Sequence, residues 1–167
     1  MKRILITLLI LAVWAGIANA AGTCVQATGS PSYVYAKTSV GSQLAAKVVT
    51  LTCTHHTDNS LSVALASTIM DELSGWYVYS MKSIPSGVTA PTDATDFEIT
   101  DADGLSLVGA NGTDFIDATS TQKTLGYNTF LTVNEYLSPV ASETWTISTT
   151  NNAVASAIFT LKIYLAR

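Results

Sequence analysis

Residues 75–109 read GWYVYSMKSIPSGVTAPTDATDFEITDADGLSLVG. An apolar run from Trp76 to Met81 leads into a loop marked by two prolines, and an alternating run follows in which Phe97 and Ile99 share one face. The tetrapeptide Asp-Ala-Asp-Gly at 101–104 then marks a turn before a further run of leucine and valine. Period-two alternation bounded by Gly, Pro and Asp is typical of half-buried strands joined by tight turns. We therefore expect this segment to form the middle of an antiparallel sheet.

The same alternation recurs on both sides of this segment. Apolar and β-branched residues at every second position predict strands at 33–37, 44–54, 60–66, 129–136, 144–148 and 157–165. Residues 67–73 are interpreted as a loop or short turn, with one capped helical turn as the alternative, and 109–123 as a long polar connection. About eight or nine short strands predict an all-β fold, a single antiparallel β-sandwich of immunoglobulin-like or jelly-roll-like type. A closed barrel is the second choice.

The N-terminus has the three parts of a secretory signal peptide. A short basic region containing Lys2 and Arg3 precedes an almost wholly apolar run, and an A-x-A site ends at Ala20. We expect cleavage between Ala20 and Ala21, which leaves 21–167 as one β-sandwich domain. The alternative is an uncleaved N-terminal anchor, although the apolar run is short for a membrane span. An exported protein, periplasmic or extracellular, with no membrane contact after cleavage is therefore predicted.

Charge narrows the range of partners. Charged residues make up only 12% of the 167 residues, and the net charge is −4. Removal of Lys2 and Arg3 with the signal leaves six basic residues against twelve acidic ones, a net charge of −6. Because the sequence shows no basic cluster, nucleic acid is not expected as a partner.

The chain contains two cysteines, Cys24 and Cys53. An even cysteine count in an exported chain favours a disulfide, which would tie the mature N-terminus to the second predicted strand. The alternative is a pair of free or metal-binding thiols, but an isolated pair at this spacing makes no zinc site by itself.

The turn at Asp101, Asp103 and Gly104 begins like a calcium loop. An EF-hand would next need an oxygen ligand at 105 and a glutamate at 112, where this chain has Leu105 and Gly112. Asp-Gly is ordinary hairpin chemistry, so a structural turn is favoured. A looser calcium site that adds a nearby aspartate from 114–117 is the alternative.

The adjacent residues His55 and His56, followed by Asp58, form the chain's one histidine cluster. Neighbouring residues on a strand point to opposite faces, so we interpret the pair as part of a solvated turn, with a weak metal site as the alternative. The chain contains no Gly-x-Ser-x-Gly sequence. No catalytic residues and no cofactor are predicted, and we expect a protein that is not an enzyme.

Three aromatic residues, Trp76, Tyr77 and Tyr79, lie close together in the apolar run. Aromatic residues at alternating strand positions are typical of core contacts and cross-strand pairs. The alternative is an exposed platform on which a sugar or a peptide stacks.

The order of these motifs resembles a family of small β-proteins encoded among the structural genes of tailed bacteriophages and prophages. The resemblance covers Leu61 to Leu165. It rests on an aromatic strand, Pro-Ser-Gly, Ala-Pro-Thr-Asp, an acidic alternating strand ending in Asp-Ala-Asp-Gly, a Leu-Gly-rich loop and the final strand pair, at 76–81, 85–87, 90–93, 96–104, 107–113, 143–148 and 157–165.

The resemblance implies a non-enzymatic structural or interaction protein, a virion-associated or prophage-derived module. Its implied partners are proteins, either further copies in a homo-oligomer or other virion components. The export signal departs from this family, whose members normally carry none. The alternative is a secreted or periplasmic binding module that recognises a glycan or a protein.

Overall fold

The structure is a computed structural model that describes residues 22–37, 43–125 and 143–166. The predicted signal peptide, its cleavage site at Ala20 and Ala21, and the predicted strand 129–136 lie outside the described residues.

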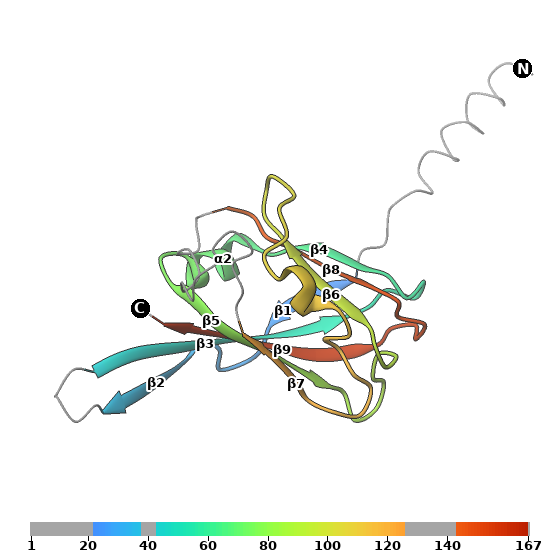
Figure 1. Cartoon of the computed structure of the whole chain (residues 1–167), viewed down its shortest axis with the longest axis horizontal. Coiled ribbons are helices and arrows are strands. Elements are labelled where there is room, and N and C mark those ends of the chain that lie inside the picture. Colours follow the sequence, from blue (N-terminus) through green and yellow to red (C-terminus); the bar gives the residue numbers. More distant parts are fainter. Residues whose placement is uncertain (1–21, 38–42, 126–142, 167) are drawn as a thin grey trace, which may run out of the picture.

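Two antiparallel sheets pack face to face, which confirms the predicted all-β sandwich (Figure 1). The larger sheet has six strands in the order β1-β3-β9-β5-β7, and β2 also pairs with β3. The smaller sheet has three strands in the order β4-β8-β6. The strands of the larger sheet are β1 (Thr23–Gln26), β2 (Ser32–Lys37), β3 (Gln43–Thr54), β5 (Tyr77–Pro85), β7 (Gln122–Leu125) and β9 (Ile158–Ala166). The remaining elements are β4 (Leu61–Ala64), β6 (Asp96–Thr100), β8 (Thr146–Thr150), the helix α2 (Ser67–Leu73) and the 3-10 turn η1 (Gly109–Gly112).

Alternation of apolar and polar residues correctly predicted β6 and β9, whereas β1 and β7 were not predicted. In β9 every second residue from Phe159 to Leu165 is buried, and the residues between them are partly exposed. In β6 Phe97 and Ile99 are buried, whereas Glu98 is exposed. One face of each strand therefore enters the interior between the two sheets.

The segment 75–109 does not form the middle of one sheet, so that prediction is wrong. β5 lies inside the larger sheet, but β6 forms an edge of the smaller one. The connection between them, residues 86–95, is longer than a hairpin loop and carries the chain from one layer to the other. After the 101–104 turn the chain forms only an isolated bridge between Thr100 and Ser106, and Leu105 is 47% exposed.

Residues 67–73 form the helix α2, which corrects their interpretation as a loop or short turn. Ile69, Met70 and Leu73 are buried, and Asp71 is exposed. The smaller sheet has short strands and covers only part of the larger sheet, and α2 lies over another part (Figure 1). Lys47 of β3 donates to the backbone carbonyl of Glu72 and forms an ion pair with its carboxylate, which joins the helix to the sheet.

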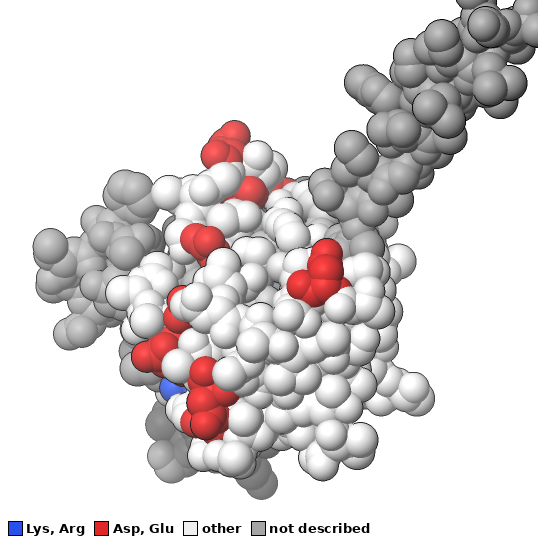
Figure 2. Space-filling model, turned by 90° about the vertical axis from the view of Figure 1, so that its right-hand side faces the viewer, with Lys and Arg blue, Asp and Glu red and all other residues white. Residues whose placement is uncertain are grey.

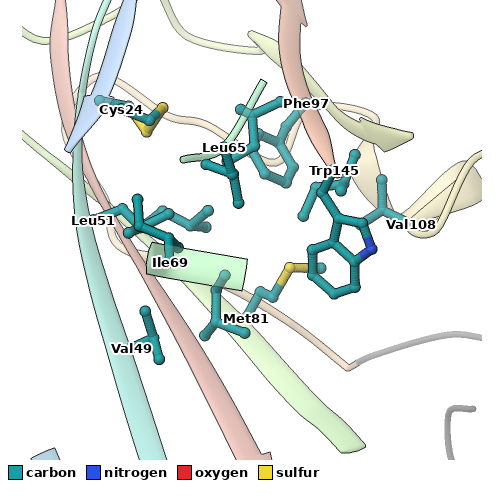
Figure 3. Close-up of a cluster of buried hydrophobic side chains, with 14 of the residues drawn as sticks. Cys24, Val49, Leu51, Leu65, Ile69, Met81, Phe97, Val108 and Trp145 are labelled. Atoms are coloured by element: carbon teal, nitrogen blue, oxygen red, sulfur yellow. A yellow bond between two sulfur atoms is a disulfide. The ribbon is translucent and has the colours of Figure 1, made fainter. Parts of the chain in front are cut away.

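The core draws side chains from both sheets, from α2 and from connecting loops (Figure 3). Phe97 of β6 meets Phe159 of β9 edge to face, with ring centroids 6.4 Å apart, and contacts Phe115 at 5.3 Å. Phe115 and its buried neighbour Ile116 belong to the predicted polar connection 109–123, which also contains η1 and the start of β7. That connection therefore contributes to the core.

Cys24 and Cys53 form a disulfide, as predicted. Both residues are buried, and they occupy directly paired positions of β1 and β3. The bond therefore anchors β1, a strand that the sequence pattern did not predict, to the longest strand of the larger sheet. A disulfide is compatible with an exported protein.

Candidate interaction site

The turn at 101–104 is closed by hydrogen bonds within the chain. The Asp101 side-chain oxygen Oδ1 accepts the backbone N–H groups of Asp103, at 3.0 Å, and Leu105, at 2.8 Å. Gly104 has φ of 80° and donates its N–H to the Asp101 carbonyl. No group of three or more His, Cys, Asp or Glu side chains that could hold a metal ion occurs within the described ranges. Calcium binding by Asp101 and Asp103, the alternative to a purely structural turn, stays a prediction.

His55 is buried, which corrects its interpretation as part of a solvated turn. Its exposed fraction is 2%. Its Nδ1 lies 3.1 Å from the Ala157 carbonyl oxygen, which can only accept, so Nδ1 carries the proton and Nε2 accepts from the Thr149 hydroxyl at 2.8 Å. Burial lowers the pKa of His55, and the hydrogen bond to Ala157 partly opposes that shift. The ring therefore acts as a neutral structural link between the two sheets.

The neighbouring residue His56 has the solvated character that was predicted. Its Nδ1 lies 3.2 Å from the Asp58 carboxylate, in an exposed turn. The hydroxyl of Ser60 donates to that carboxylate and, with the Ser60 backbone N–H, lowers the pKa of Asp58. The two histidines thus differ in burial and do not share one site.

The three residues of the predicted aromatic platform lie in different surroundings. Trp76 is partly buried against the core, and the ammonium nitrogen of Lys47 lies 5.4 Å from its ring centroid. Tyr77 and Tyr79 are 40% and 53% exposed on either side of the buried Val78, at a β-bulge in β5. The structure therefore brings the two tyrosines to the surface, and their role in binding stays a prediction.

Strand register assembles a basic feature that the sequence pattern did not predict. Lys82 of β5 pairs directly with Lys162 of β9 on one side and with Lys123 of β7 on the other. Directly paired residues share a face, and Lys162 alternates with the buried residues of β9, so all three lysines lie on the outer face of the larger sheet. We call Lys82, Lys123 and Lys162 the lysine row.

The lysine row has no internal counterion among the described residues. The ion pairs found there involve Lys47 and His56, and none involves a member of the row. Adjacent strands lie about 4.8 Å apart, so the three lysines start from neighbouring backbone positions, an arrangement in which like charges repel. An external anionic group would relieve that repulsion.

The outer face of the smaller sheet carries a shallow acidic depression of about 190 Å³. Its floor and rim come from β6, β8 and η1. Asp96 is held in place, since its carboxylate accepts from Asn151 Nδ2 at 2.6 Å and from the Asp114 backbone N–H at 2.9 Å. The carboxylate of Glu98 is exposed and makes no hydrogen bond or ion pair to another described residue. We call this surface the acidic depression; it is lined by Asp96, Phe97, Glu98, Gly109, Gly112, Thr113, Ser148, Thr149 and Thr150.

The two outer faces of the sandwich thus carry opposite charge. Seven of the twelve acidic residues belong to the segment 93–117, which contains β6 and η1. Figure 2 shows the side of the molecule that lies on the right in Figure 1, where acidic side chains are spread over the surface and very little basic surface is visible. The lysines of the row are about 40 residues apart in the chain, so only the pairing of distant strands could reveal them.

The chain matches no protein-family model and no curated protein. Within the described ranges, no helix has the length and apolar character needed to cross a membrane.

Proposed function

We propose that the protein is a non-enzymatic structural or interaction protein, a virion-associated or prophage-derived β-sandwich module. The observation that carries the proposal is the opposite charge on the two outer faces of the sandwich. One face holds three lysines without a described counterion, and the other holds an acidic depression. Charge arranged in this way promotes specific contact with a partner protein and selects against wrong partners.

The build of the domain supports a mechanical role. The two sheets share one apolar core, and a disulfide fixes the N-terminal strand to β3. Such a sandwich presents its outer faces on rigid strands, which hold side chains more firmly than loops do.

Fractionation of the source culture tests the proposal. Assembled particles would be separated on a density gradient from free protein, and each fraction would be probed for this chain. We expect the chain to sediment with the particles and to remain with them at moderate salt. Recovery of all of the chain as free protein, in a culture that yields particles, would contradict a virion-associated role.

A secreted or periplasmic binding module for a glycan or a protein is the second candidate. The exposed pair Tyr77 and Tyr79 favours it, because aromatic rings at a surface stack on sugars and on apolar side chains. A glycan array with the wild type and with Tyr77→Ala/Tyr79→Ala separates the candidates. Specific binding that the double variant loses would favour this second function.

A further inference from the structure

We propose that the lysine row of one copy docks on the acidic depression of a second copy, so that the chain associates with itself head to tail. The inference rests on the proposed structural role and names its partner. Both surfaces belong to the same chain, but they lie on opposite outer faces of the sandwich. One molecule cannot bring them together, whereas two molecules can.

Charge favours a second copy over a linear polyanion such as nucleic acid. The chain has a net charge of −4, so it repels a nucleic acid, which is negatively charged along its whole length, more strongly at long range than it repels a second copy of itself. A second copy offers a bounded acidic surface. Its depression presents the exposed carboxylate of Glu98 beside the fixed carboxylate of Asp96.

Shape is consistent with the same pairing. A lysine side chain is a flexible four-carbon stem that ends in a compact ammonium group. The acidic depression is open and holds about 190 Å³, enough for an ammonium head and part of its stem. The backbone beneath it is closely packed, since a Cβ at Gly112 would stand 1.8 Å from the Phe97 carbonyl oxygen. The flexible lysine side chains can therefore adjust to the shape of the depression.

The symmetry of the contact determines which kind of oligomer forms. The two docking surfaces differ, so the contact is heterologous and leaves one free lysine row and one free acidic depression at the ends of every open oligomer. Such a contact produces a ring if the rotation between copies closes, and a filament if it does not.

Charge-reversal variants of the protein test the proposal. Their association would be measured by sedimentation velocity over a range of concentrations. The row variant is Lys82→Glu, which changes the charge by −2, and the depression variant is Glu98→Lys, which changes it by +2. We expect each variant to raise the concentration of half-association by about tenfold or more. We also expect about 1 M salt, where the Debye length is about 3 Å, to dissociate the wild type.

Matched controls carry similar charge changes elsewhere. Ser67→Glu/Thr68→Glu changes the charge by −2 at exposed positions of α2, and Asp103→Lys changes it by +2 at an exposed position of the 101–104 turn, away from the depression. Both controls should associate as the wild type does. An equimolar mixture of the row variant and the depression variant should associate again, because each then meets a face of opposite charge.

Several outcomes would overturn the proposal. They are a wild type that stays monomeric at every concentration and salt, row and depression variants that associate like their controls, or a mixture that stays dissociated. Retention of the wild type, and not of the row variant, on immobilised heparin or duplex DNA without self-association would assign the row to a polyanion. If self-association fails while the chain still sediments with particles, the structural role stands and only the self-contact is wrong.

Discussion

The two sheets of the sandwich are built differently, although they share one core. The larger sheet has long central strands, with twelve residues in β3 and nine in each of β5 and β9. The smaller sheet has strands of four or five residues. The larger sheet therefore presents more apolar surface than three short strands can cover, and within the described residues α2, Val108 before η1 and the loop containing Phe115 supply further cover. The comparison teaches that the layer opposite the long strands is a mosaic of a sheet, a helix and loops.

Replacement of Phe159, whose ring contacts residues of both layers, should have the largest effect on stability. Phe159 is fully buried in β9, contacts Phe97 of the smaller sheet and lies 5.8 Å from His55. We expect Phe159→Ala to lower the free energy of unfolding by about 3–5 kcal/mol, through lost burial and a residual cavity. Urea unfolding would measure it, with Val88→Ala as the control, since Val88 is 94% exposed and should change stability by less than about 0.5 kcal/mol. Equal effects of the two substitutions would contradict a common core centred on β9.

Loss of the disulfide, which joins two strands of the larger sheet, should have the second largest effect on stability. The bond closes a loop of 29 residues, for which chain entropy gives about 3–4 kcal/mol. Guanidinium unfolding of the wild type with and without reductant should show a loss of that order. The variant Cys24→Ala/Cys53→Ala is the control, because reductant should leave its stability unchanged. Alkylation of both cysteines in the native oxidised protein would show that the bond is not formed.

Substitutions in the 101–104 turn, which follows β6, test the contribution of the smaller sheet to stability. Gly104 has a positive φ, so Gly104→Val should lower the free energy of unfolding by roughly 1 kcal/mol or more. Asp103→Asn should change it little, because asparagine tolerates turn conformations. Thermal melting of both variants, with calcium and with chelator, would measure the effects. If chelator lowered the melting temperature of the wild type by several degrees and Asp103→Asn removed that difference, the turn would be a metal site.

The smallest expected effect concerns the histidine that joins the layers. The pKa of His55 is lowered in the folded state, so below about pH 6.5 the unfolded chain takes up a proton that folded His55 resists. Stability from this group is therefore complete at higher pH and decreases as the pH falls through that region. Melting temperatures at about pH 7.5 and about pH 5.5 would measure the decrease. His55→Gln should reduce the pH dependence, whereas the control His56→Gln should retain it; the reverse result would assign the effect to His56.

Local patterns in the sequence predicted the strands because burial of one face imposes a period of two. That rule applied to β6, β8 and β9, whose apolar residues alternate. It also led to a helix being interpreted as a loop, because α2 has only seven residues and no side-chain cap at its N-terminus. A helix of two turns is too short for its period of about 3.6 residues to be recognised in the sequence. Its stability comes from packing against the sheet beneath it.

The features that local patterns did not predict depend on contacts between distant residues. The burial of His55 depends on Thr149 and Ala157, about a hundred positions along the chain. The lysine row depends on the register of three strands. Assignment of β5 and β6 to different sheets likewise depends on which strands pair. A single sequence specifies these contacts only through the complete fold.

The division of the N-terminal segment into β1 and β2 gives the larger sheet an edge of two short strands, of four and six residues, a device that limits pairing with other chains. Both strands lie along the same side of β3, and between them the Ala27 N–H and the Ser30 hydroxyl hydrogen-bond the backbone of Thr50. The backbone groups of β3 on that side are thus used, and β7, at the opposite edge, has four residues in the described part of the chain. Exposed strand edges are sites at which one chain can pair with another through backbone hydrogen bonds, as in amyloid. The self-association that we propose uses side chains on the outer faces of the sandwich and needs no backbone pairing at these edges.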